Sequence, residues 1–367
     1  MPGACLILLT LLSAAQPAAE ALFERGQRQQ RSGQLAAAEA TYRQYLKEYG
    51  PRAEVLANLG ALLAGQERYP PAIAAYRQAL KLAPSLAPIH LNLGLAYFKS
   101  GQHDAALVEF DAFLKADPAH RQARQLRAVS LLELERPAEA AQAYLTLPPE
   151  DPSVQIGLAT AYTRLGKSGE AQRILQALLA RENSAEVHLL LSQAYLEENR
   201  KDEALASLQR ASGLNPRLPS LRYYFGLAYW KQQHAEQALA EWRRELERDA
   251  NYFPAIFALG GALATNPQAG EEALKYLRRA RALRPRNAPA LYQLAKLLWQ
   301  RGKDPEAAPL LETAIASDPQ YREAHYLLGT IYQALGRKSL AAREFAVVKR
   351  LTEEGAARSQ DLFETAR

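Results

Sequence analysis

Cysteine is almost absent from this chain of 367 residues, because Cys5 is its single example. The rest of the chain therefore offers no disulfide, no thiolate metal site and no catalytic thiol. Strand-forming residues are also sparse, whereas Ala, Leu, Arg, Glu and Gln are abundant, and this balance favours helices. A formal net charge of +6 is too weak by itself to indicate nucleic-acid binding. We therefore expect an all-α protein.

Charged side chains are missing from the first 19 residues. An apolar run over residues 4–12 leads into small residues at 13–15, which is the order of a secretory signal, and the run is too short for a permanent membrane anchor. The usual basic segment before the run is absent, so a wrongly chosen start codon and a buried apolar cap on the first helix remain alternatives. We predict a signal peptide over residues 1–18, no transmembrane anchor in the mature chain, and an exported protein, periplasmic or secreted. Without export the protein would be cytoplasmic.

Two distant segments repeat one pattern. LNLGLAYFKSGQHDAALVEF spans residues 91–110, and YYFGLAYWKQQHAEQALAEW spans residues 223–242. Each contains Gly-Leu-Ala-Tyr, an aromatic residue and Lys, then a polar corner, and then Ala before a final aromatic residue. Intervals of 31 to 35 residues from this match lead to ten alanines in phase. They are Ala38, Ala72, Ala106, Ala140, Ala171, Ala204, Ala238, Ala273, Ala307 and Ala341.

Other positions keep the same phase. A small residue usually stands twelve residues before the alanine, Tyr often stands nine before it, and an aromatic residue or Leu stands four after it. Residues spaced by three, four and seven share one face of a helix, so each unit is expected to hold two antiparallel helices in contact at the small residues, with rings filling the space beside them. Gly101 at the corner, and Pro118 after the second helix, would end the two helices.

These features resemble the tetratricopeptide repeat family, in which each unit is a helix–turn–helix and neighbouring units stack. The resemblance implies a right-handed α-solenoid of about ten repeats over residues 19–355, followed by a C-terminal capping helix or tail at 356–367. The unit at 121–151 is three residues short, where the superhelix could kink, and the unit at 253–287 has one extra residue. Tyr45, Phe113 and Glu245 stand where the family prefers a small alanine.

No catalytic motif is recognisable in the chain. Gly-Lys-Ser at 166–168 lacks the first glycine of a phosphate-binding loop, because residue 161 is Ala, and no strand is expected before it. The histidines show neither the i, i+4 spacing nor the HExxH pattern of a metal site, so His90, His188 and His325 are interpreted as packing or partly exposed residues. We expect no enzyme activity, no metal and no cofactor.

The stretch RRARALRPR at 278–286 contains five arginines: Arg278, Arg279, Arg281, Arg284 and Arg286. A phosphate-binding patch is one hypothesis for it. The exposed face of a second helix, with cations near its C-terminus, is the favoured alternative, because no aromatic residues lie between the arginines to stack on bases.

Aromatic residues recur at two positions of the expected first helices, three residues before the small residue and seven residues further on, along the same face. The resemblance implies that this face lines the inner, concave groove. Aromatic side chains are common anchors at interfaces, so we predict that the band binds an extended peptide or a helix, with simple packing as the alternative. The band comprises Tyr223, Trp230, Phe257, Tyr292, Trp299 and Tyr326, with Lys231 and Lys296 nearby.

Three residues nearer the N-terminus complete the predicted protein-binding set. Phe98 occupies the second aromatic position, and Asn58 and Asn92 occupy matching groove positions of consecutive units. Some members of the family use such asparagines to hold a bound peptide backbone. The asparagine series ends with Leu126 and Gly157, and the flanking Lys and Asn of a C-terminal carboxylate clamp are missing. Chaperone-tail binding of that kind is therefore not predicted.

The predicted function is a non-enzymatic scaffold that binds a peptide or protein partner in the concave groove. Export would place it in cell-envelope assembly or secretion, in a bacterial-type envelope. One alternative is a repeat region that recruits substrates for a separate enzyme. Another is a nucleic-acid-binding repeat protein, which the charge pattern disfavours. Homo-oligomerisation through an end repeat also remains open.

Overall fold

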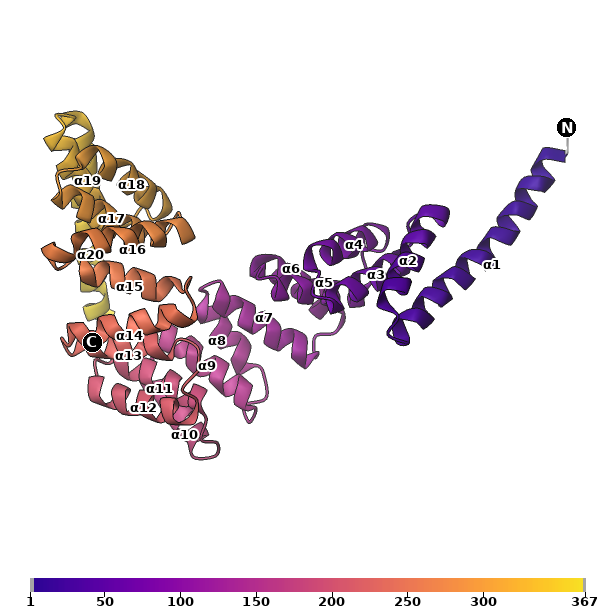
Figure 1. Ribbon diagram of the computed structural model, residues 1–367, viewed down its shortest axis with the longest axis horizontal. Coiled ribbons are helices and arrows are strands. Elements are labelled where there is room, and N and C mark those ends of the chain that lie inside the picture. Colours follow the sequence, from indigo (N-terminus) through magenta and orange to yellow (C-terminus); the bar gives the residue numbers. More distant parts are fainter. Residues whose placement is uncertain (1–2, 366–367) are drawn as a thin grey trace. The chain divides into compact units, whose positions relative to one another are not determined.

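The computed structural model describes the backbone of residues 3–365 and the side chains of residues 16–354. Residues 3–365 form twenty α-helices, one short 3-10 helix and no strand (Figure 1), which confirms the all-α prediction. The helices belong to two compact units, Met1–Asn183 and Ser184–Arg367. In both units the helices pair in chain order, an odd-numbered first helix with the even-numbered second helix that follows it.

The first unit holds five helix pairs. They are α1 (Gly3–Arg31) with α2 (Leu35–Tyr49), α3 (Ala53–Gly65) with α4 (Tyr69–Leu82), α5 (Ala87–Lys99) with α6 (His103–Ala116), α7 (Arg121–Glu133) with α8 (Pro137–Leu145), and α9 (Pro152–Arg164) with α10 (Ser168–Leu179).

The second unit also holds five pairs. They are α11 (Ala185–Glu197) with α12 (Lys201–Leu214), α13 (Leu221–Lys231) with α14 (Ala235–Arg248), α15 (Phe253–Leu263) with α16 (Gly270–Leu283), α17 (Ala288–Gln300) with α18 (Asp304–Ser317), and α19 (Arg322–Ala334) with α20 (Lys338–Thr365). The 3-10 helix η1 (Pro267–Ala269) lies between α15 and α16.

The ten in-phase alanines lie at the helix contacts, as predicted. The first nine have no exposed surface, and Ala341 is 4% exposed. The glycine of the first helix faces the ring four residues after the alanine, so the ring lies on the glycine rather than beside it: a Cβ on Gly94 would approach the Phe110 ring to 2.8 Å. Where the second helix carries leucine, the first helix usually carries Ala or Ser, as in Ala295 and Leu311. Small and large residues are therefore matched across each pair.

The corners within the pairs share a left-handed residue. Gly33, Gly101, Gly166, Gly302 and Gly336 adopt φ values between 69° and 76°. Four corners use a residue with a side chain, and those residues are Glu67, Glu135, Asn199 and Gln233, with φ between 56° and 66°. The corner of the pair α15 and α16 is built around η1 instead, and this is how the one extra residue of that repeat is accommodated.

The repeat at 121–151 is short because its second helix is shorter than those of other repeats. Helix α8 has 9 residues, whereas α6 has 14. As a result the ring of Tyr144 reaches the next pair, where a Cβ on Gly157 would lie 2.2 Å from it. The expected kink at this repeat stays a prediction.

Both predicted terminal segments fall largely outside the described side chains. The signal peptide was predicted over residues 1–18 and the capping tail over 356–367, and side chains are described only for 16–354. Among the described residues, no helix is both long enough and apolar enough to cross a membrane.

Candidate protein-binding surface

First helices of neighbouring pairs contact one another, for example α11 with α13 and α17 with α19. In a curved stack of helix pairs, equivalent helices of neighbouring pairs lie closer together in the inner layer than in the outer layer. We therefore interpret the first helices as the inner layer within the second unit. The predicted aromatic band lies on four of these helices, α13, α15, α17 and α19.

The structure separates this band into exposed and packed side chains. Trp230 is 37% exposed, Trp299 is 36% exposed, and Tyr326 is 60% exposed. By contrast, Tyr223, Phe257 and Tyr292 are half-buried. Large aromatic side chains that remain accessible are candidates for contact with a partner, whereas the half-buried ones also serve the fold.

Two tyrosines of the band pack against a tyrosine that precedes the next first helix, with the rings at interplanar angles of 71° and 49°. The ring centres of Tyr223 and Tyr252 are 5.6 Å apart, and those of Tyr292 and Tyr321 are 5.1 Å apart. Burial raises the pKa of Tyr223 to about 12, and the neighbouring Tyr252 adds to this effect. The packing alternative therefore holds for one face of each of these rings. Tyr252 and Tyr321 were not predicted from the sequence, although both stand immediately before a helix.

An aromatic hollow of about 400 Å³ lies between α17, α19 and α20. Four members of the predicted set line it, which are Tyr292, Lys296, Trp299 and Tyr326. Leu327 and Val348 add apolar surface, and Thr330 and Thr352 add hydroxyl groups. The ion pair of Arg322 with Glu323 adds charged groups to the lining. A hollow with aromatic walls and a few polar groups has the composition of a binding site for an apolar side chain.

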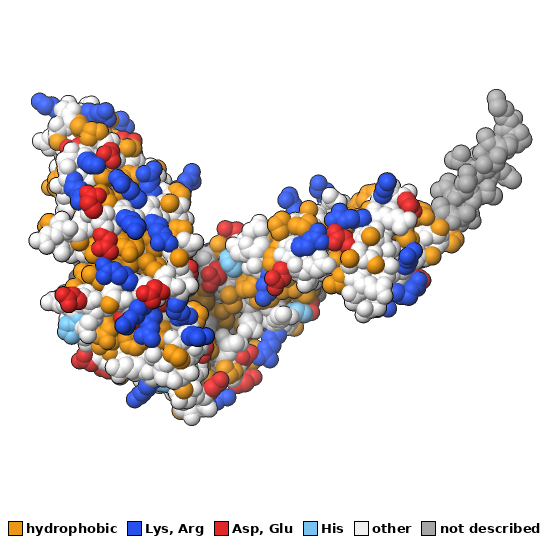
Figure 2. All heavy atoms as spheres, in the orientation of Figure 1, with side chains coloured by type: hydrophobic (Ala, Val, Ile, Leu, Met, Phe, Trp, Pro, Cys, Tyr) orange, Lys and Arg blue, Asp and Glu red, His pale blue; other side chains and the backbone are white. Residues whose placement is uncertain are grey.

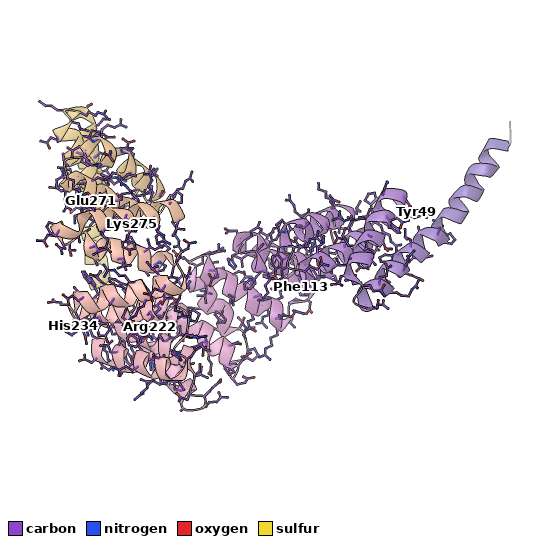
Figure 3. All side chains as sticks on the ribbon, viewed as in Figure 1. Tyr49, Phe113, Arg222, His234, Glu271 and Lys275 are labelled. Atoms are coloured by element: carbon purple, nitrogen blue, oxygen red, sulfur yellow. The ribbon has the colours of Figure 1, made fainter. Side chains whose placement is uncertain are left out.

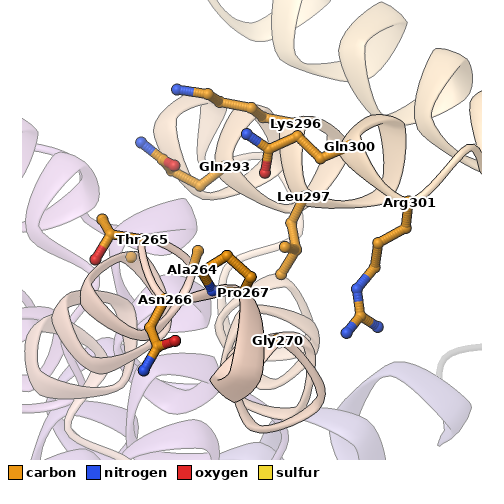
Figure 4. A pocket seen from close by; sticks show the side chains of 11 residues that line it. Ala264, Thr265, Asn266, Pro267, Gly270, Gln293, Lys296, Leu297, Gln300 and Arg301 are labelled. Atoms are coloured by element: carbon orange, nitrogen blue, oxygen red, sulfur yellow. The ribbon is translucent and has the colours of Figure 1, made fainter.

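A polar hollow of about 400 Å³ lies beside it, between α15, η1 and α17 (Figure 4). The side chains of Asn266, Gln293 and Gln300 line it together with Lys296 and Arg301. Gly261 also lines it, and no atom outside its own local backbone lies within 4 Å of the position of its absent Cβ. Amide groups can pair with both the N–H and the C=O of an extended backbone, so this hollow suits a peptide main chain. The amide residues were not predicted from the sequence.

Lys296 lines both hollows, which makes it the centre of the surface. Among residues 16–354, neither Lys296 nor Lys231 forms an ion pair, and both side chains are exposed. Glu323 also lines the aromatic hollow, but it pairs with Arg322 and not with Lys296. An exposed ammonium group that forms no ion pair favours a partner with a carboxylate at this point.

The other predicted residues of the second unit lie outside the two hollows. The Trp230 ring centre is 6.0 Å from that of the buried Trp242, so one side of Trp230 packs on the core while the rest stays accessible. The Phe257 ring stacks on Phe253 at 6.0 Å with an interplanar angle of 9°. Phe257 is thus more a packing residue than an anchor.

In the first unit, the three predicted residues lie on the neighbouring first helices α3 and α5. Asn58 hydrogen-bonds the phenol of Tyr42, where it opposes the rise in pKa that burial causes. Phe98 packs edge-on against His103, with ring centres 5.3 Å apart. Asn92 is half-buried. None of the three lines either hollow described above, so the surface that the structure assembles lies in the second unit.

The repeated histidines take part in packing between the paired helices. His90 Nδ1 lies 2.6 Å from a carboxylate oxygen of Glu109, and His325 Nδ1 lies 2.6 Å from one of Glu344. Arg222 occupies the matching place in the second unit (Figure 3), and its guanidinium lies 3.4 Å from Glu241. These pairs tie a first helix to its second helix, which supports the structural interpretation of the histidines.

The arginine stretch is divided between structural and exposed residues. Arg279 donates hydrogen bonds to the backbone carbonyl of Ala250 and to Asn251, and the Arg284 guanidinium lies 4.3 Å from the centre of the Phe253 ring. On the visible face of the second unit, acidic side chains alternate with basic ones (Figure 2). Glu271, on the same helix α16 as the arginines, is one such residue (Figure 3). This distribution does not provide a continuous basic strip for a phosphate backbone.

A family model described as tetratricopeptide repeat matches residues 91–154, 156–219 and 292–356, more than half of the chain. The chain belongs to the tetratricopeptide repeat family. A second model, described as TPR repeat, matches residues 60–101. Such repeat domains are typically non-catalytic scaffolds for protein–protein interaction. A comparison with curated proteins finds no match.

Two solved structures illustrate the similarity of fold for this tetratricopeptide repeat protein. One is a tetratricopeptide repeat protein from Parabacteroides merdae, with 19% identity, a TM-score of 0.54, and coverage of 71% of this chain and 98% of that chain. The other is the APC/C hetero-tetramer Cut9–Hcn1, with 14% identity, a TM-score of 0.56, and coverage of 91% and 73%. At these identities the likeness concerns the fold alone.

Proposed function

We propose that this protein is a non-enzymatic scaffold that binds a peptide or protein partner along the first helices α13 to α19. The observation that carries the proposal is the pair of hollows that share Lys296, one aromatic and one polar. An apolar side chain fits the first, and a peptide backbone or carboxylate fits the second. The accessible rings of Trp230 and Trp299 extend the same surface.

The test is affinity capture of the tagged protein from its native lysate, followed by purification of the captured partner and measurement of its Kd. The variant Trp230→Ala/Trp299→Ala should weaken binding by about 30-fold or more, because accessible tryptophans are frequent hot spots of about 2 kcal/mol. Circular dichroism should show unchanged helicity.

The matched control for this experiment is Leu283→Ala. Leu283 is 38% exposed, and this exposed fraction is similar to those of Trp230 and Trp299. Unlike the tryptophans, it lies on a second helix, at the end of α16. This control should bind like the native protein. Equal losses in the control and the double variant would refute the groove, and a large loss of helicity in the double variant would identify the tryptophans as core residues.

We further propose that the protein is exported and works in assembly of a cell envelope or in secretion. The support is the uncharged, apolar N-terminal sequence, which ends in small residues. Mass spectrometry of the mature N-terminus decides the point, since export through a cleaved signal requires loss of about the first 18 residues. A mature protein that still begins with residue 1 would refute cleavage.

A further inference from the structure

The last helix pair, α19 and α20, leaves uncovered a face that is covered in every other pair. Seven residues after each in-phase alanine stands a side chain that faces the next pair. In the nine earlier pairs this residue is at most 7% exposed, whereas in the last pair it is Val348, which is only half-buried. The nine buried residues are Tyr45, Ala79, Phe113, Leu147, Leu178, Ala211, Glu245, Ala280 and Ala314.

Helix α20 does not turn to cover this face. Six of the nine other second helices end before a proline twelve residues after the alanine, as α18 does before Pro319, but the matching residue of α20 is Glu353. The i, i+4 ion pairs of Lys349 with Glu353 and of Arg350 with Glu354 span the point where the others stop. The helix therefore continues to Thr365 and is 28 residues long, against 14 for α18.

Tyr326 shows what is missing from this face. The two tyrosines at its position in earlier pairs, Tyr223 and Tyr292, pack with their rings inclined against Tyr252 and Tyr321, which precede the next first helix. Tyr326 has a ring contact only within its own pair, with Phe345 at 6.0 Å, among the residues whose side chains are described. It is 60% exposed, the largest value in the aromatic band.

The uncovered face opens into the aromatic hollow. Tyr326 and Leu327 of α19 and Val348 and Thr352 of α20 form one side of that hollow. In the earlier pairs the corresponding space is filled by the first helix of the following pair, so the chain itself provides the template for an occupant: a helix with an aromatic residue directly before its first turn.

We propose that this face binds an amphipathic helix of a partner protein, packed as the first helix of an eleventh pair, with an aromatic residue in contact with the ring of Tyr326. The proposal rests on the proposed function, since it assigns the kind of partner, but it extends the contact to the second helix α20. A second copy of this chain fits less well. The residue in the matching place before its first repeat is Ala18, which offers no ring.

The test uses a fluorescein-labelled, N-acetylated and C-amidated peptide of residues 318–334, which is the covering helix of the preceding pair together with Tyr321. Fluorescence anisotropy should show saturable binding to the full chain. The Tyr321→Ala peptide should bind about tenfold more weakly, because it loses the contact between the two aromatic rings. Val348→Asp in the protein should abolish binding, and Tyr326→Ala should weaken it about tenfold without affecting the fold.

The control variant is Ala346→Asp, an exposed residue on the same helix, which should leave binding unchanged. Absence of saturable binding at about 1 mM peptide, or equal binding by Val348→Asp and the native protein, would overturn the proposal. Light scattering could instead show that the native protein self-associates and that Val348→Asp abolishes this self-association. That result would assign the face to a second copy of the chain and overturn the proposal of a partner helix. If the peptide did not bind but the variant Trp230→Ala/Trp299→Ala still lost its captured partner, the proposal for this face would fail and the proposed function of the groove would stand.

Discussion

Gly226 is the position at which the packing of paired helices can be tested most sharply. A Cβ added there would lie 2.3 Å from Trp242 Nε1 and 2.5 Å from its Cδ1. Trp242 is 1% exposed, and its indole N–H donates a hydrogen bond of 3.1 Å to the carbonyl of Tyr223. The ring cannot move aside without losing this bond or displacing the surrounding core.

The expected cost of Gly226→Ala follows from these contacts. Overpacking a core costs about 1–3 kcal/mol, and a lost hydrogen bond adds about 1 kcal/mol. The higher helix propensity of alanine, compared with glycine, stabilises the folded state by about 1 kcal/mol. We therefore expect Gly226→Ala to destabilise the second unit by about 1–3 kcal/mol.

Gly261 provides the matched control with the opposite sign. It lies within the first helix α15, and a Cβ there would meet nothing within 4 Å. Gly261→Ala should therefore stabilise the second unit by about 0.5–1 kcal/mol through helix propensity alone.

Urea unfolding followed by tryptophan fluorescence suits both variants, because the three tryptophans of the chain, Trp230, Trp242 and Trp299, all lie in the second unit. The midpoints should move in opposite directions at constant slope. If Gly226→Ala raised the midpoint as Gly261→Ala does, the ring would not lie on the glycine and the packing argument would be wrong.

A double variant examines the same contact from the other side. The chain itself combines alanine on the first helix with leucine on the second, as in Ala295 with Leu311. In the cycle of Gly226→Ala and Trp242→Leu, the two changes should compensate each other by about 1–2 kcal/mol. Strictly additive effects would show that the two residues do not contact each other.

Three further predictions concern other parts of the fold. Glu245→Ala should destabilise by about 1–3 kcal/mol in urea unfolding, because the buried carboxylate accepts hydrogen bonds from the N–H groups of Ser220 and Tyr223, whereas the exposed Glu247→Ala should have little effect. Asp151 caps α9, and a hydrogen bond from the Ser153 hydroxyl, with help from Arg121, lowers the pKa of its carboxyl group below the usual range. The stability that Asp151 adds over Asp151→Asn, about 1 kcal/mol, should be complete above pH ~4 and disappear as pH falls through the lowered pKa, which acid titration of both proteins would show. Glu67 has φ of 59°, so Glu67→Gly should raise stability in thermal unfolding by about 0.5–1 kcal/mol, and a loss would contradict strain at this corner.

The architecture could be predicted because the signal was periodic. A single alanine does not predict a fold, but Ala38 and its nine equivalents share one buried environment, so their regular spacing predicted the repeated helix pairs. Glu245 was an anomaly in the sequence and is explained only by the structure, since its bonds to Ser220 and Tyr223 join residues more than 20 positions apart.

The candidate site could be predicted only in part. The pattern located the aromatic band, but it could not separate Tyr292 from Tyr326, which stand at the same repeat position. Their difference depends on Tyr321, which packs on the ring of Tyr292, whereas no ring from a following pair packs on Tyr326 among the residues whose side chains are described. Gln293 and Gln300 gave no signal, because exposed amides are common on helices and only the corner at η1 turns them into the wall of a hollow.

The matching of rings to glycines inside each pair has a consequence for how such a chain changes over generations. A pair like α5 and α6 carries both halves of its own contact, Gly94 and Phe110, so it can be duplicated or exchanged as a block without strain. The pair α7 and α8 lacks this independence, because Tyr144 rests on Gly157 of the following pair. Excision of residues 121–151 would leave Gly157 without its ring, so we expect this repeat to be exchanged only together with its neighbour.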